Sequence, residues 1–109
     1  MKLKPVMWTL DDALALVREI QPLTRDFNYH LVIGGSVVNN GESRKDLDLY
    51  FLPLCNGNLN DSIGMQTALV GLFGPGEPLG SEDTYEHDPR WFKTKFMRGK
   101  QRIDSFIWK

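Results

Sequence analysis

The sequence Ile33-Gly34-Gly35-Ser36 is followed, after a spacer of nine residues, by Asp46-Leu47-Asp48-Leu49, and these two segments are the most informative part of the chain. Side chains alternate between the faces of a β-strand, so Asp46 and Asp48 point to the same face. Two carboxylates on one face of an apolar strand are costly to desolvate unless a cation meets them. A third aspartate, Asp104, lies in another apolar segment near the C-terminus. Aspartates on neighbouring strands would form an oxygen cage for Mg²⁺ or Mn²⁺.

The combined pattern resembles the signature of the nucleotidyltransferase superfamily, which has the polymerase-β-like fold. That signature is an apolar residue, Gly-Gly/Ser, a spacer of about ten residues, and two aspartates that alternate with apolar residues. The match covers roughly residues 28–108, and the segment of the third carboxylate departs from it at Ser105. The resemblance implies transfer of a nucleoside monophosphate from an NTP such as ATP to a hydroxyl acceptor, with Mg²⁺ or Mn²⁺ as cofactor and pyrophosphate released.

The resemblance also assigns roles to the three carboxylates. Asp46 and Asp48 would ligate the metal ions of a two-metal in-line displacement. Asp104 would ligate the catalytic ion and help to deprotonate the acceptor hydroxyl. Two plainer interpretations remain: a solvated strand with two exposed acids, and a cross-strand ion pair between Asp104 and Lys95.

The segment Gly34-Gly35-Ser36 is expected to bind phosphate. Residues without side chains let backbone amides approach an anion, and the start of a helical turn favours negative charge. The Ser36 hydroxyl would bond a β- or γ-phosphate oxygen. A purely structural turn is the alternative. Further nucleotide-binding candidates are cations just before the acidic strand and near the C-terminus: Arg44, Lys45, Lys93 and Lys95. Charged side chains that are simply solvated at the surface are an equally good interpretation of these four residues.

Composition bounds the class of protein. The chain has 109 residues, enough for a single domain at 1–109, with 41% hydrophobic and 25% charged residues. A formal net charge of −1 gives no global field that would attract nucleic acid. No apolar run is long enough to span a membrane, and the single cysteine, Cys55, favours a reducing, cytoplasmic setting.

Residue patterns predict an α+β fold with two layers: a small mixed β-sheet, helices packed on one face, and a C-terminal β-hairpin. The predicted elements are a helix at 10–20 capped by Thr9 and ended by Pro22, a buried strand at 29–33, a short helical turn at 36–39, a strand at 46–52, a helix from about 61 to 72, a long loop at 74–90, and a hairpin at 91–108 that turns at Gly99-Lys100. The hairpin register pairs Lys95 with Asp104.

The acceptor and the partners stay open. The sequence ends directly after the third-carboxylate segment, where many members of the superfamily add a helical domain that grips base and acceptor. Selectivity is then expected from residues 74–90, from the aromatic face of the C-terminal hairpin or from a protein partner, and assembly with a partner or as a homo-oligomer stays open. RNA ends, proteins and small molecules remain candidate acceptors, so nucleic acid is not excluded as a partner. The alternative function is a non-catalytic nucleotide- or protein-binding module, antitoxin-like or an inhibitor of a partner.

Overall fold

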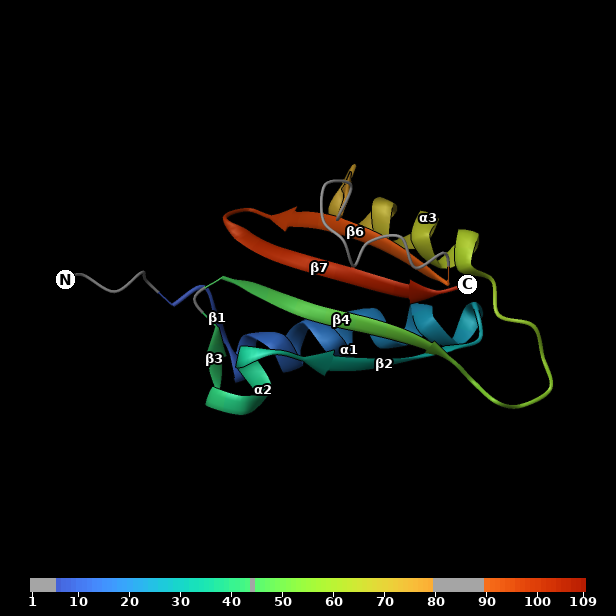
Figure 1. Ribbon diagram of the computed structural model, residues 1–109, viewed down its shortest axis with the longest axis horizontal. Helices are drawn as coiled ribbons and strands as arrows, with labels where there is room; N and C mark the ends of the chain where they lie inside the picture. The colour runs from blue at the N-terminus through green and yellow to red at the C-terminus, as the bar shows by residue number, and fades with distance from the viewer. Residues whose placement is uncertain (1–5, 44, 80–89) are drawn as a thin grey trace.

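The computed structural model describes residues 6–43, 45–79 and 90–109. Its main feature is a five-stranded mixed sheet in the order β2-β4-β7-β6-β5, shown in Figure 1. The strands are β2 (Tyr29–Gly34), β4 (Asp46–Pro53), β5 (Glu77–Pro78), β6 (Trp91–Arg98) and β7 (Gln101–Trp108). β4 and β7 pair in parallel, and the other neighbours are antiparallel. A small second sheet joins β1 (Trp8–Thr9) to β3 (Glu42–Ser43).

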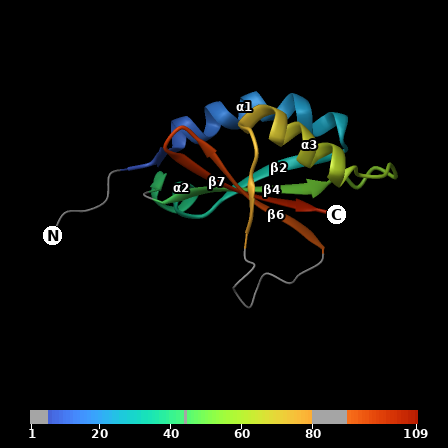
Figure 2. The ribbon, with the colours of Figure 1, turned by 90° about the horizontal axis from the view of Figure 1, so that it is seen from above.

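Two long helices form the second layer. α1 (Leu10–Asp26) and α3 (Ser62–Phe73) lie on the same side of the sheet, as Figure 2 shows, and α2 (Ser36–Asn40) follows β2 at its end. The prediction of a two-layer α+β fold with helices on one face is confirmed.

The core lies between these layers and follows from the alternation in each strand. In β4 the residues Leu47, Leu49 and Phe51 are completely buried, whereas their neighbours face the opposite side. The helices supply the other half of the core, mainly through Ala13, Leu16, Ile20, Met65 and Leu69. Burial of this apolar surface is the main force that fixes the sheet against α1 and α3.

The hairpin of β6 and β7 has the predicted register. Arg98 lies opposite Gln101 and Lys95 opposite Asp104. Gly99 has a φ of 64° and Lys100 does not share this left-handed conformation, as a type II′ turn requires.

Three predictions about elements were wrong. α1 runs six residues beyond Ile20 to Asp26, with Pro22 inside it. Pro22 removes one backbone hydrogen bond, but the next turn still buries Thr24, whose hydroxyl donates to the Gln21 carbonyl oxygen at 2.8 Å. β2 is the edge strand of the sheet rather than a fully buried one, and the segment expected to be a loop at 74–90 contains β5. Residues 80–89 of that segment lie outside the described residues.

Candidate metal and nucleotide site

The three predicted carboxylates come together on the face of the sheet opposite α1 and α3. The parallel pairing of β4 and β7 places Asp48 beside Asp104, and Asp46 is two residues earlier on the same face of β4. One carboxylate oxygen from each of Asp46, Asp48 and Asp104 lies within 4.8 Å of the others. We call these three residues the carboxylate cluster.

The cluster is only partly open to solvent. Asp104 is 7% exposed, and Asp46 and Asp48 are half-buried. Burial, the hydrogen bond with Asp104 and the charges of Asp104 and Asp48 raise the pKa of Asp46 to about 6. Burial, followed by the charge of Asp104, also raises the pKa of Asp48. Crowded carboxylates of this kind gain stability from a proton or from a bound cation.

The Gly34-Gly35 turn abuts the cluster. Gly34 pairs with Asp48 in the β2–β4 ladder, and Gly35 has a φ of 78°. A Cβ atom on Gly35 would lie 2.7 Å from the Oδ2 atom of Asp48. Glycine at position 35 is therefore required both by the backbone and by the carboxylate. Space beside the carboxylate is thus kept by the missing side chain.

α2 begins directly after this turn but is short. It spans Ser36–Asn40, and its first residues bond back to Gly35, whose carbonyl oxygen accepts from the amides of Val38 and Asn39. Ser36 is the first residue of this helix, as predicted. Five residues give only a weak helix dipole, so the turn offers backbone amides rather than a strong helix terminus.

Among the described residues, Arg102 is the cation that bonds directly to the cluster, and sequence reasoning missed this role. Its Nε atom donates to Asp104 Oδ1 at 2.9 Å, and its Nη2 atom donates to Asp104 Oδ2 at 3.3 Å. Its Nε atom is also 3.9 Å from Asp46 Oδ2. Arg102 precedes Asp104 by two residues on β7, so the same alternation that groups Asp46 with Asp48 was the available signal.

Lys95 is engaged elsewhere and does not form the cross-strand ion pair with Asp104 that the sequence left open. Lys95 lies opposite Asp104 in the register, but its Nζ atom forms an ion pair with Glu77 at 3.1 Å, across to β5. Lys45 is exposed, and its charge lowers the pKa of Asp48, opposing the effect of burial. Lys93 lies opposite Phe106, one step further along the hairpin. Arg44 lies outside the described residues.

An aromatic cluster continues the same face beyond the carboxylates. Tyr50, two residues after Asp48, stacks on Phe106 with ring centroids 4.9 Å apart and planes 13° apart. Trp91 meets Tyr50 and Trp108 edge to face, at 6.2 and 5.0 Å between centroids. The Arg90 guanidinium lies 5.2 Å from the centre of the Trp108 ring. The half-buried rings form an apolar floor next to the carboxylate cluster.

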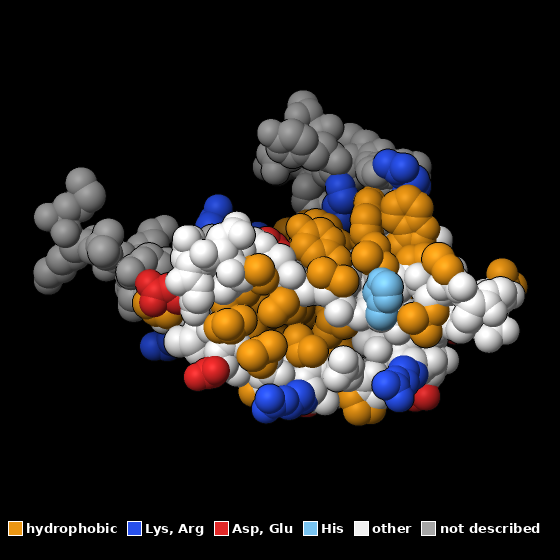
Figure 3. Space-filling view, turned by 90° about the horizontal axis from the view of Figure 1, so that it is seen from below, with side chains coloured by type: hydrophobic (Ala, Val, Ile, Leu, Met, Phe, Trp, Pro, Cys, Tyr) orange, Lys and Arg blue, Asp and Glu red, His pale blue; other side chains and the backbone are white. Residues whose placement is uncertain are grey.

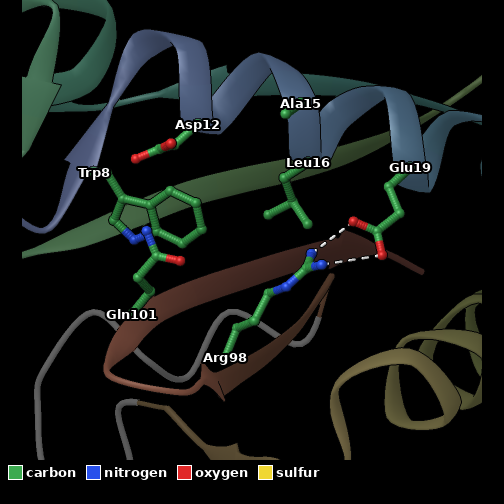
Figure 4. A pocket seen from close by; sticks show the side chains of 7 residues that line it. All are labelled: Trp8, Asp12, Ala15, Leu16, Glu19, Arg98 and Gln101. Atoms are coloured by element: carbon green, nitrogen blue, oxygen red, sulfur yellow. Dashed lines mark hydrogen bonds and ion pairs between the residues drawn. The ribbon is translucent and has the colours of Figure 1, made fainter.

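A separate cavity of about 210 Å³ lies between α1 and the tip of the hairpin. Figure 4 shows Glu19 and Arg98 pointing toward one another across it, and Arg98 donates to Glu19 at 2.7 and 3.2 Å. The cavity also contains Trp8, whose Nε1 atom donates to the Arg102 carbonyl oxygen at 2.8 Å. None of the three cluster carboxylates lines this cavity, which separates it from the candidate site.

Comparison with protein-family models finds none that matches the chain, and comparison with curated proteins finds no significant match. Among the described residues, no helix is long and apolar enough to cross a membrane.

Proposed function

We propose that the chain is a metal-dependent nucleotidyltransferase that moves a nucleoside monophosphate from an NTP to a hydroxyl acceptor, releasing pyrophosphate. The observation that carries the proposal is the carboxylate cluster facing the Gly34-Gly35 turn. Three carboxylates within 4.8 Å, two of them with raised pKa values, lie beside the glycine whose missing side chain leaves Asp48 accessible.

The donor set suits a hard divalent cation. Mg²⁺ and Mn²⁺ prefer carboxylate oxygens, and two oxygens bound to one Mg²⁺ at about 2.1 Å each are at most about 4.2 Å apart. The cluster oxygens lie within 4.8 Å of one another, close to this limit, so small side-chain rotations would bring them onto one ion. Asp46, Asp48 and Asp104 would hold the ion, which supplies charge stabilisation for an in-line displacement at phosphorus.

The chain's own residues supply the remaining parts. The backbone of the Gly34-Gly35 turn lies next to Asp48, where the triphosphate would approach. Asp104 would accept the proton of the attacking hydroxyl, because it is the most buried carboxylate of the cluster. Lys45 adds positive charge on the solvent side of Asp48. The aromatic floor beginning at Tyr50 is suited to a base or to an apolar part of the acceptor.

Calorimetric titration tests this proposal. Each NTP is titrated with and without Mg²⁺ or Mn²⁺ into the wild type, into Asp48→Asn, and into Asp26→Asn as a control on an exposed carboxylate of α1. We expect metal-dependent binding in the wild type and the control and at least a tenfold weaker affinity in Asp48→Asn. Absence of binding in the wild type with every metal and NTP would contradict the proposal.

A second candidate function rests on Arg102. Its paired hydrogen bonds to Asp104 already balance part of the negative charge without a metal. This arrangement favours a non-catalytic module that keeps the pocket for protein or nucleotide contact. In that case NTP binding would be absent or would not depend on the metal in the same titrations. For either function, the lone Cys55 supports a reducing, cytoplasmic setting as part of the proposal.

A further inference from the structure

The outer edge of β2 carries backbone groups that no described strand pairs. β2 is an end strand, and β4 is its partner in the sheet. The Leu54 amide donates to the Asn28 carbonyl oxygen, so positions 28 and 54 are a hydrogen-bonded pair of the antiparallel ladder. Because such pairs alternate, His30, Val32 and Gly34 bond inward to β4. The amides and carbonyls of Leu31 and Ile33 therefore point outward, away from the sheet.

This edge lacks the features that usually prevent pairing. β2 contains no acidic residue, lysine, arginine or proline, and its central Val32 is 43% exposed. Val38, on the neighbouring α2, is 51% exposed. Figure 3 looks at the molecule from the side of β2 and shows hydrophobic side chains gathered in the middle of this surface. An open edge without acidic residues, lysine or arginine and with exposed apolar side chains is a template for another strand.

The opposite edge of the sheet is partly covered, where β5 pairs with Thr94 and Lys95 of β6. β5 has only two residues, one of which is Pro78, and its Glu77 is held in the ion pair with Lys95. Proline and charge both discourage strand addition. β2 is therefore the less protected edge, and pairing of β2 with β2 of a second copy gives a closed dimer, because both copies use the same surface.

We propose that β2 pairs antiparallel with β2 of a second copy of this chain, with the two Val32 residues facing each other across the two-fold axis. In this register Leu31 of one copy lies opposite Ile33 of the other, and each such pair exchanges two hydrogen bonds through the outward groups. Val32 meets Val32 at the non-hydrogen-bonded position between them, where side chains are closest. The strand is its own best complement because no like charges meet and the exposed valines cover each other.

The interface is small, since it consists of one strand and its flanks. Specific interfaces usually bury about 1,200–2,000 Å² in total, so we expect this smaller interface to associate weakly. Val32 shares a face of the sheet with Tyr50, its partner in the β2–β4 ladder, and Tyr50 shares that face with Asp48. Because the two Val32 residues also lie on one face, the two carboxylate clusters would lie on the same face of the continuous ten-stranded sheet. The proposal does not depend on the enzymatic function.

Sedimentation velocity from about 1 to 200 µM tests association of the full chain. Val32→Lys places two ammonium groups against each other at the axis and should leave a monomer at every concentration. Met97→Lys is the matched control, because Met97 is also on a strand and is 45% exposed, but lies on the hairpin. We expect the wild type and Met97→Lys to dimerise. A monomeric wild type, or a Val32→Lys protein that still dimerises, overturns the proposal.

A cross-linking variant tests the register and does not depend on the folding of Val32→Lys. In a Cys55→Ser background, which removes the exposed native thiol, Val32→Cys should form a disulfide-linked dimer on mild oxidation. The Cα atoms of a non-hydrogen-bonded pair are about 4.5 Å apart, within the range that a disulfide spans. Met97→Cys in the same background should stay monomeric. Failure of Val32→Cys to cross-link in a sample that contains dimer overturns the proposed pairing.

Discussion

At the scale of single residues, Gly35 links the turn to the carboxylate cluster. Its φ of 78° is unfavourable for any residue with a side chain, and an added Cβ atom would lie 2.7 Å from Asp48 Oδ2. The two effects differ in their consequences. The conformational cost falls on stability, whereas the contact with Asp48 displaces a proposed metal ligand.

Gly35→Ala should therefore lose both stability and metal affinity. We expect a loss of about 1–2 kcal/mol in the free energy of unfolding from the left-handed backbone, measured by urea denaturation. We also expect at least a tenfold loss of Mn²⁺ affinity in calorimetry, because Asp48 must rotate away from its neighbours.

Gly41→Ala separates the two effects. Gly41 has a φ of 75° but nothing lies within 4 Å of an added Cβ atom. This variant should lose less stability than Gly35→Ala, because Gly41 is in the αL conformation whereas Gly35 has a ψ of −156°, and it should keep the Mn²⁺ affinity of the wild type. Equal Mn²⁺ affinity in both variants would refute the link between the Gly35 turn and the metal site.

At the scale of elements, α1 depends on its cap. The Thr9 side chain accepts from the Asp12 amide, and the Asp12 side chain accepts in return from the Thr9 amide, which forms a capping box. α1 carries much of the core through Ala13, Leu16 and Ile20. Loss of the cap should therefore weaken the whole fold.

Thr9→Ala should lower the free energy of unfolding by about 1 kcal/mol, because the Asp12 amide loses its acceptor. Thr67→Ala is the control: Thr67 is exposed in α3, and its hydroxyl only donates to the Ile63 carbonyl oxygen within the helix. Urea denaturation of both variants measures the difference. A Thr9→Ala protein no less stable than Thr67→Ala would contradict a stabilising role for the capping box.

The elements also show what local sequence can predict. The Thr9 cap, the alternation of β4 and the turn at Gly99 are all determined by residues within a few positions, and these predictions are confirmed. The end of α1 was missed because packing of Thr24 outweighs the local penalty of Pro22. Long-range pairing decides whether β2 is central or at an edge of the sheet. A short apolar run in the sequence does not distinguish these two positions.

At the scale of the whole molecule, the site depends on the parallel pairing of β4 with β7, which are separated by α3, β5 and β6 in the sequence. The alternation in each strand predicted which residues share a face, but not that Asp46 would lie beside Arg102. The alternation of β7 already places Arg102 on the face of Asp104, but only the pairing of β4 with β7 brings Arg102 next to Asp46. The carboxylate cluster also couples the stability of the molecule to pH.

The stability of the metal-free protein should rise as the pH falls through about 6. The pKa of Asp46 is raised to about 6 in the folded protein, above the value of about 3.9 expected for an unfolded chain. Between these values the folded state binds more protons than the unfolded state, so acid favours folding. Above pH 6 the ionised Asp46 costs on the order of 1–3 kcal/mol, since one pKa unit corresponds to about 1.4 kcal/mol.

Asp46→Asn isolates this contribution, because the amide keeps the size of the side chain but carries no charge. At pH 7.5 the variant should be more stable than the wild type, and at pH 4 the difference should vanish. Asp26→Asn, which removes an exposed carboxylate at the end of α1, should follow the wild type at both values. Thermal unfolding without metal gives the comparison, and a wild type whose advantage over Asp46→Asn grows with pH would reverse the expected sign.

Saturating Mg²⁺ should raise the melting temperature of the wild type more at pH 7.5 than at pH 5, since the ion binds the ionised cluster and competes with protons. Asp46→Asn should lose most of this metal effect, so stability in the absence of the ion and response to the ion are expected to change in opposite directions.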